Sequence, residues 1–408
     1  AALFWVRWSD PAQRRYRNLF RKASAAAPPP LRPGRLHRSV PMGLPGFLLT
    51  RAALLSSAAG QSTCGDGIHC LKVAGAVEKL TFNCRQAGPA MGEASVGNVM
   101  LLHGFPEWSS MYVPLMRRLA DRGYRSVACN QRGYSSGARP DRVTDYDYNT
   151  LAADVWAIAA AFNFTSGGSK FHLVGHDHGG ILGWVVAASP RGAASLLSYT
   201  SLSVPHPAAF SAGLFGAAAD QKQQDVSQYF SIFTLNESAS LRGSILYHTM
   251  GATTSDADMG DAFADATSFQ KAIWWYNGAM DASVIAMPPV ISAWELTKRG
   301  SFASAAMRAL FGGTPRPGNA AAHSPGSVGM PALYVCGGSD FAILCNRPYA
   351  LKTADYCAAA EYSYFEVDCG HNLLSCAKPD ETEKVTAAII AHLDAAGREG
   401  GDSAYAYV

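Results

Sequence analysis

The stretch Gly175-His176-Asp177-His178-Gly179-Gly180 decides the fold. The buried apolar run 171–174 leads into it, and the helical pattern 181–189 leads out of it. A strand that turns sharply through small residues into a helix lifts the middle residue of the turn above a parallel sheet. Glycines suit such a turn because a side chain two or three residues further on would collide with the facing strand and helix. The pattern therefore predicts a nucleophile elbow at Asp177; an ordinary helix-capping Asp is the alternative.

Apolar runs and helical patterns alternate on both sides of this stretch. The runs are apolar throughout rather than at every second residue, which is typical of a parallel sheet that helices cover on both faces. Strands are expected near 72–77, 80–84, 98–102, 126–129, 171–174, 196–204, 332–337 and 363–367, and helices near 112–123, 151–162, 181–189, 349–359 and 385–393. The sequence therefore predicts an α/β fold with a mostly parallel sheet flanked by helices.

The alternation stops at Pro205-His206-Pro207 and resumes near residue 330. The segment between is rich in Ala and aromatic residues and has helical patterns, so we expect an inserted helical cap domain. An insertion at this point lies over the carboxyl ends of the strands, where open α/β sheets bind ligands. The expected organisation is a presequence or disordered leader at 1–62, a core at 63–205, the cap at 206–329, the second part of the core at 330–400 and a tail at 401–408.

Length and charge narrow the classes of function. The chain has 408 residues, of which 48% are hydrophobic, enough for a large buried core. Residues 1–40 carry a net charge of +8 and the remainder carries −5. The excess of acidic side chains on the folded part argues against a nucleic-acid partner.

The leader contains an apolar segment that begins at Met42 and ends in small residues near Gly60. It resembles the hydrophobic region of a secretory signal peptide, although Arg51 interrupts it, and it is too short for a stable transmembrane span. We therefore expect a secreted protein or one of the endomembrane lumen. The Arg-rich, acid-poor composition also fits import into an organelle.

The nine cysteines show no zinc-type spacing. If the leader is secretory, up to four disulfides are expected. His176 and His178 flank Asp177, but alternate residues at the end of a strand point to opposite faces, so no metal site is expected there.

Two further polar residues follow predicted strands. Asp340 lies in a Gly-rich loop after 332–337, and His371 lies in the loop after 363–367. Along the chain, the order is nucleophile, acid, histidine. Triads that consist of Ser, an acid (Asp or Glu) and His on an α/β sheet have this order, and other triad enzymes have different ones. Either residue alone is typical of a turn or of a satisfied polar group. Together with Asp177, at strand ends and in this order, they predict a catalytic constellation.

Residues 72–397 resemble the α/β-hydrolase superfamily, and within it the branch of epoxide hydrolases and haloalkane dehalogenases, which carries Asp rather than Ser at the elbow. The motifs that carry the resemblance are HGFPEW from His103, RGYSSGARP from Arg132, VGHDHGG from Val174, GGSDF from Gly337, DCGHN from Asp368 and KPDE from Lys378. The resemblance implies an α/β-hydrolase fold, with His371 as general base and Asp340 as the acid that orients it.

An Asp nucleophile suits displacement at saturated carbon, because a carboxylate is already ionised near pH 7. The product is an ester of Asp177, which water activated by His371 then hydrolyses. The expected oxyanion hole consists of the backbone N–H groups of Phe105 and His178. This chemistry needs neither a cofactor nor a metal.

The leaving atom separates the two branches of the family. Epoxide hydrolases present two cap tyrosines to the epoxide oxygen, and Tyr229 and Tyr276 match them. Dehalogenases place Trp directly after the nucleophile, where this chain has His178. Residues expected to line the pocket for a small apolar epoxide and water are Pro106, Trp108, Trp275 and Asn372.

The expected function is hydrolysis of an epoxide to a vicinal diol. His178 and Asn372 also depart from epoxide hydrolases, which typically carry Trp at the first position and often at the second, so the pocket wall is expected to be smaller and more polar. A haloalkane or haloacid dehalogenase, or another α/β hydrolase with an Asp nucleophile, is the first alternative. A non-catalytic ligand-binding relative is the second.

Overall fold

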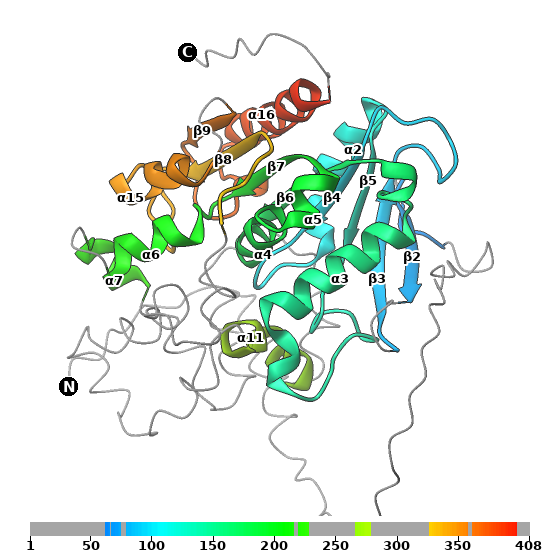
Figure 1. Cartoon of the computed structure of the whole chain (residues 1–408), viewed down its shortest axis with the longest axis horizontal. Coiled ribbons are helices and arrows are strands. Elements are labelled where there is room, and N and C mark those ends of the chain that lie inside the picture. The colour runs from blue at the N-terminus through cyan, green and yellow to red at the C-terminus, as the bar shows by residue number, and fades with distance from the viewer. Residues whose placement is uncertain are drawn as a thin grey trace, which may run out of the picture. The chain divides into compact units, whose positions relative to one another are not determined.

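The computed structural model describes residues 62–65, 67–74, 79–215, 219–227, 266–278, 326–357 and 361–397. In this part of the chain, nine strands form one sheet in the order β1-β2-β3-β5-β4-β6-β7-β8-β9 (Figure 1). The strands are β1 (Ser62–Thr63), β2 (His69–Ala74), β3 (Thr81–Ala87), β4 (Asn98–Leu102), β5 (Arg125–Cys129), β6 (Phe171–His176), β7 (Leu196–Leu202), β8 (Ala332–Gly337) and β9 (Tyr362–Val367). The six strands β4 to β9 are parallel to one another. At one edge of the sheet, β1, β2 and β3 pair antiparallel, and β3 also pairs antiparallel with β5. The mostly parallel sheet predicted from the sequence is confirmed.

Helices follow most of the parallel strands. The α-helices are α2 (Val113–Asp121), α3 (Tyr148–Ala161), α4 (His178–Ala187), α5 (Pro190–Ser195), α6 (Pro207–Phe215), α7 (Gln221–Val226), α11 (Ala266–Gly278), α15 (Pro348–Leu351) and α16 (Pro379–Ala396), and the 3-10 helices are η1 (Ser109–Tyr112), η2 (Val143–Tyr146), η3 (Ser166–Gly168), η4 (Lys352–Tyr356) and η5 (Leu373–Ser375). Local chemistry sets several of the starts. For example, α3 begins after Asp147, whose carboxylate accepts hydrogen bonds from the N–H groups of Asn149 and Thr150.

Both faces of the central part of the sheet are buried. Successive side chains of a strand point to opposite sides, so each central strand contributes to two core clusters. In β4, Met100 and Leu102 belong to the core cluster that includes residues of α3 and α4. Val99 and Leu101 belong to the second cluster, which includes residues of α2 and α16. This two-sided burial explains why the central strands read as continuous apolar runs.

The predicted cap, 206–329, lies largely outside the described residues. Its described helices are α6, α7 and α11. Helix α11 packs against the loop after β5, where the indole N–H of Trp275 donates to the carbonyl of Arg132 at 2.7 Å. Lys271 Nζ donates to the carbonyl of Pro140 at 3.0 Å. The cap boundaries remain predictions, as does the leader, nearly all of which lies outside the described residues.

All nine cysteines of the sequence lie in the described residues, and eight of them form disulfides. The pairs are Cys64–Cys70, Cys84–Cys129, Cys336–Cys345 and Cys369–Cys376, and Cys357 is free. Four disulfides are the number that the sequence allowed. None of the helices in the described residues has both the length and the apolarity that crossing a membrane requires.

Candidate active site

Asp177 lies at the tip of the turn between β6 and α4. Its backbone has φ 51° and ψ −121°, a left-handed conformation that residues other than Gly rarely adopt. The turn needs the glycine two residues on, because a Cβ at Gly179 would overlap the carbonyl oxygens of Leu102 and His103. The side chain of Asp177 makes no capping hydrogen bond to α4. The geometry is therefore that of a nucleophile elbow rather than of a helix-capping Asp.

The structure brings together the three residues that the sequence singled out. His371 Nε2 lies 3.2 Å from Asp177 Oδ2, and His371 Nδ1 lies 2.8 Å from Asp340 Oδ2. All three side chains are buried. They lie in the turns that follow β6, β8 and β9, so the parallel sheet places them at one edge. The carboxylate of Asp340 is itself held in place, because its Oδ1 accepts hydrogen bonds from the N–H groups of Ala342 and Ile343.

The second carboxylate oxygen of Asp177 faces the loop after β4. The N–H of Phe105 donates to Asp177 Oδ1 at 2.8 Å. This approach is possible because Gly104 has no side chain, since a Cβ there would overlap Cβ and Oδ1 of Asp177. The Phe105 N–H therefore has the position expected of an oxyanion donor. The second expected donor, the N–H of His178, belongs to the peptide directly after Asp177.

His103 holds this loop in place, a role that sequence reasoning did not assign to it. Its Nδ1 donates to the carbonyl of Gly104 at 2.9 Å, and its Nε2 accepts from the N–H of Gln131 at 3.0 Å. Burial lowers the pKa of His103 to about 4, so the ring is neutral and can do both. The signal was present in the sequence, because His103 opens the motif HGFPEW.

Electrostatics favour an ion pair between Asp177 and His371. Burial opposes ionisation of Asp177, but the hydrogen bond with His371 and the nearby imidazoles outweigh it and hold the pKa of the carboxyl below its usual range. Burial likewise opposes protonation of His371, but the charge of Asp340 and the hydrogen bonds to both carboxylates raise its pKa to about 10. The carboxylate of the elbow is therefore ionised at neutral pH, as a nucleophile must be.

Aromatic residues of α11 lie beside the elbow. The ring of Tyr276 is edge-on to His178, with centroids 4.1 Å apart, and edge-on to Phe105 at 5.4 Å. Trp275 also faces His178, at 5.9 Å. The indole N–H of Trp275 already donates to the carbonyl of Arg132. Trp275 can therefore contact a substrate with its apolar ring rather than with a hydrogen bond. Tyr229, the other predicted tyrosine, lies outside the described residues.

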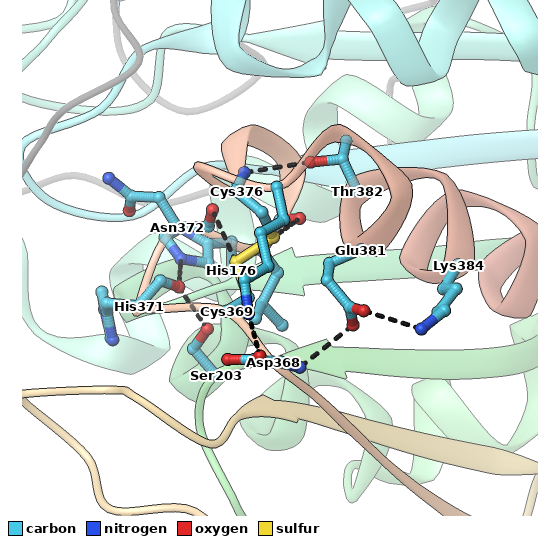
Figure 2. Close-up of a disulfide and its surroundings, with 12 residues drawn as sticks. His176, Ser203, Asp368, Cys369, His371, Asn372, Cys376, Glu381, Thr382 and Lys384 are labelled. Atoms are coloured by element: carbon cyan, nitrogen blue, oxygen red, sulfur yellow. Dashed lines mark hydrogen bonds and ion pairs between the residues drawn. A yellow bond between two sulfur atoms is a disulfide. The ribbon is translucent and has the colours of Figure 1, made fainter.

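The other three predicted pocket residues differ in their surroundings. Pro106 is buried after Phe105. Trp108 is buried and packs edge-on against Tyr134, with centroids 5.5 Å apart. Asn372 is half-buried next to His371 (Figure 2). Pro106 and Asn372 thus adjoin residues of the site, and Trp108 contacts Tyr134, which in turn lies edge-on to Trp275.

The two histidines that flank Asp177 point to different neighbours. His176 Nε2 donates to the carbonyl of His371 at 3.0 Å. His178 Nδ1 lies 3.2 Å from the hydroxyl of Tyr148, a residue that no sequence signal marked. The two imidazoles therefore have separate roles. Among the described residues, no group of three His, Cys, Asp or Glu side chains could hold a metal ion.

Comparisons with known proteins agree with this fold. The model of the alpha/beta hydrolase fold family matches residues 97–375. The chain is 31% identical over 143 residues to AB hydrolase superfamily protein YfhM of Bacillus subtilis, covering 35% of this chain and 46% of the relative. It is 35% identical over 122 residues to epoxide hydrolase 3 of Xenopus tropicalis, covering 30% and 31%. The matches thus span less than half of these relatives.

A solved structure shows the same fold. It belongs to a study of novel epoxide hydrolases of the alpha/beta hydrolases superfamily in metagenomes from hot environments, and it matches with a TM-score of 0.56 at 22% identity. The match covers 79% of this chain and 98% of the other. With the family match over most of the sheet and the elbow, these findings identify the chain as a member of the α/β-hydrolase fold family.

Proposed function

We propose that this protein hydrolyses a small apolar epoxide to a vicinal diol through a covalent ester on Asp177. One observation carries the proposal: the carboxylate at the elbow has one oxygen bonded to the Phe105 N–H and the other 3.2 Å from His371 Nε2. A carboxylate in this position can attack saturated carbon directly. The similarity to epoxide hydrolases supports the choice of substrate class.

In the first half-reaction, Asp177 Oδ2 attacks an epoxide carbon and the ring C–O bond breaks. The oxygen that is released needs a proton, which a tyrosine hydroxyl supplies. Tyr276 is the candidate among the described residues, because its ring lies against both His178 and Phe105. Tyr229 is proposed as the second donor, by resemblance alone. The products of this step are the ester and a tyrosinate.

Ester formation removes the negative charge of Asp177, which is one of the groups that raise the pKa of His371. The pKa of His371 therefore falls, and its proton can return to the tyrosinate. The neutral imidazole is then a general base for water, while Asp340 holds its Nδ1. Alkylation of Asp177 thus prepares the base for the second half-reaction.

In that second half-reaction, water attacks Cγ of Asp177 and gives its proton to His371. The negative charge of the tetrahedral intermediate develops on Oδ1, which already accepts the N–H of Phe105. Collapse of the intermediate breaks the Cγ–Oδ2 bond, and the proton of the hydroxyl group that water added passes to the departing alkoxide. The diol leaves, and Asp177 and the protonated His371 form an ion pair again. No cofactor takes part in this scheme.

The remaining proposals concern the surroundings of the site. Residues 206–329 are proposed to form the cap that supplies the tyrosines. Secretion or residence in an endomembrane lumen is proposed, because structural disulfides persist in oxidising compartments and this chain has four.

Offering the purified full chain styrene oxide and a bromoalkane tests the function. The expected result is diol from styrene oxide and negligible bromide from the bromoalkane, and no diol from Asp177→Asn. Bromide release without diol would identify a dehalogenase instead. Absence of both products, with no covalent adduct in any variant, would leave a ligand-binding protein.

A further inference from the structure

Asp340 and His371 form a relay of hydrogen bonds to Asp177. Each of the two lies inside a short disulfide loop. Cys336 and Cys345 enclose Asp340 with a sequence separation of 9. Cys369 and Cys376 enclose His371 with a separation of 7. Asp177 lies outside both loops, at the junction of β6 and α4.

The two loops are hydrogen-bonded to each other. The N–H of Ser339 donates to the carbonyl of Cys369 at 2.9 Å, and the N–H of Gly338 donates to that of Val367 at 2.8 Å. The two loops can lie this close only because residue 337 is a glycine. A Cβ on Gly337 would overlap the carbonyl oxygens of Cys369 and Gly370. The bond between His371 and Asp340 therefore joins two loops that already touch along their backbones.

Further contacts hold the His371 loop from both sides (Figure 2). The carbonyl of His371 accepts hydrogen bonds from His176 Nε2 at 3.0 Å and from Ser203 Oγ at 2.5 Å. At the end of the loop, the N–H of Cys376 donates to Thr382 Oγ1 of α16 at 2.9 Å. The only helix or strand between the two cysteines is η5, a single 3-10 turn. The disulfide thus closes a loop that little regular secondary structure supports.

From this arrangement we infer that Cys369–Cys376 and Cys336–Cys345 are positioning groups, which hold His371 and Asp340 in register for the hydrolysis of the Asp177 ester. The inference rests on the proposed function. Alkylation needs the carboxylate of Asp177, which the packed elbow fixes without a crosslink. Hydrolysis needs the imidazole at a fixed place relative to water, and a misplacement of 1 Å can lower such a rate about a hundredfold.

This difference has a kinetic signature. In a two-step covalent mechanism, slower hydrolysis lowers kcat and KM together and leaves kcat/KM, which reports the steps up to alkylation, nearly unchanged. The ester then accumulates on Asp177 during turnover. A loss of folded enzyme behaves differently, because it lowers kcat and kcat/KM in the same proportion and leaves KM unchanged. The two causes can therefore be separated in one experiment.

The experiment compares two double variants of the full chain with styrene oxide as the probe. Cys369→Ser/Cys376→Ser opens the His371 loop. Cys64→Ser/Cys70→Ser opens a loop of separation 6 at the edge of the sheet, so both variants lose a similar loop-closure contribution to stability. We expect kcat to fall about tenfold to a hundredfold in the first variant, with kcat/KM within about threefold of wild type and ester visible by intact mass. The control is expected to keep the wild-type kcat and KM.

Cys336→Ser/Cys345→Ser provides a second measurement of the same kind for Asp340, and it decides the question if the first variant does not fold. Equal kinetics in this variant, the first variant and the control would overturn the inference, as would a loss of kcat with KM unchanged. Failure of the proposed function is a separate result, because wild type would then give no diol and no ester.

Discussion

The hydroxyl oxygen of Tyr148 lies 3.2 Å from Nδ1 of His178, the residue directly after the candidate nucleophile. The same imidazole is edge-on to Tyr276 at 4.1 Å. Burial lowers the pKa of His178, although the charge of Asp177 opposes this shift. A polar ring in a fixed orientation therefore adjoins the elbow.

Tyr148→Phe should lower kcat/KM for styrene oxide about threefold to tenfold, because it removes one neutral hydrogen bond that orients His178. Steady-state kinetics measure the effect. Tyr146→Phe is the matched control, since it also removes a buried tyrosine hydroxyl, which donates to the carbonyl of Pro140 instead. Equal values for the two variants would show that the bond to His178 has no part in the reaction.

Gly104→Ala should abolish measurable turnover, because the new Cβ would overlap the side chain of Asp177 and displace the Phe105 N–H from Oδ1. Loss of one oxyanion donor alone lowers kcat about a hundredfold to a thousandfold in other enzymes. Gly370→Ala is the control, because a Cβ at that position, next to His371 in the chain, would meet no atom within 4 Å outside the adjoining residues. An active Gly104→Ala enzyme would contradict the assigned oxyanion hole.

The titration of His371 should depend on the charge of Asp177. Its pKa is raised to about 10 in the free enzyme, against burial, by Asp340 and by Asp177. Asp177→Asn removes one of these charges, so the pKa should fall toward the ordinary value of 6.5, and NMR of the histidine ring should follow it. The sign matters: a pKa that stayed the same or rose would contradict the preparation of the base by ester formation.

Stability should depend on the buried ion pair that fixes the loop after β5. Arg132 donates to both carboxylate oxygens of Asp154, at 2.6 and 2.8 Å, and both side chains are buried. Asp154→Ala removes the carboxylate that neutralises the buried Arg132 and should lower the free energy of unfolding by about 3 to 5 kcal/mol. Glu383→Ala removes an exposed partner of Arg118 and should change it by about 0 to 1 kcal/mol. Urea denaturation measures both free energies of unfolding. Equal losses in the two variants would contradict a stabilising role of the buried ion pair of Arg132 and Asp154.

The sequence predicted the relay because its three residues each follow a strand, and a parallel sheet brings the carboxyl ends of its strands to one edge. Tyr148 could not be predicted in this way. It lies at the start of α3, and its contact with His178 depends on how that helix packs beside α4. His103 stood in a quoted motif, but its role depends on Gln131, which belongs to a different loop.

The cysteine pairing and one helix also needed the structure. Nine cysteines do not define their partners, and Cys129 meets Cys84 only because β3 and β5 are neighbours in the sheet. One helix was expected over 349–359. The structure has the short α15 followed by η4, and the chain then pairs at Cys357 with Val328 in a β-bridge, which uses backbone groups that a helix would need.

The central claim is that the carboxylate of Asp177 becomes covalently bonded to the substrate. The most direct measurement is the mass of His371→Gln after incubation with styrene oxide, followed by peptide mapping. The account predicts an increase equal to the mass of one styrene oxide, located on the peptide that contains Asp177 and absent from Asp177→Asn. An unmodified His371→Gln protein beside a wild type that forms diol would contradict it.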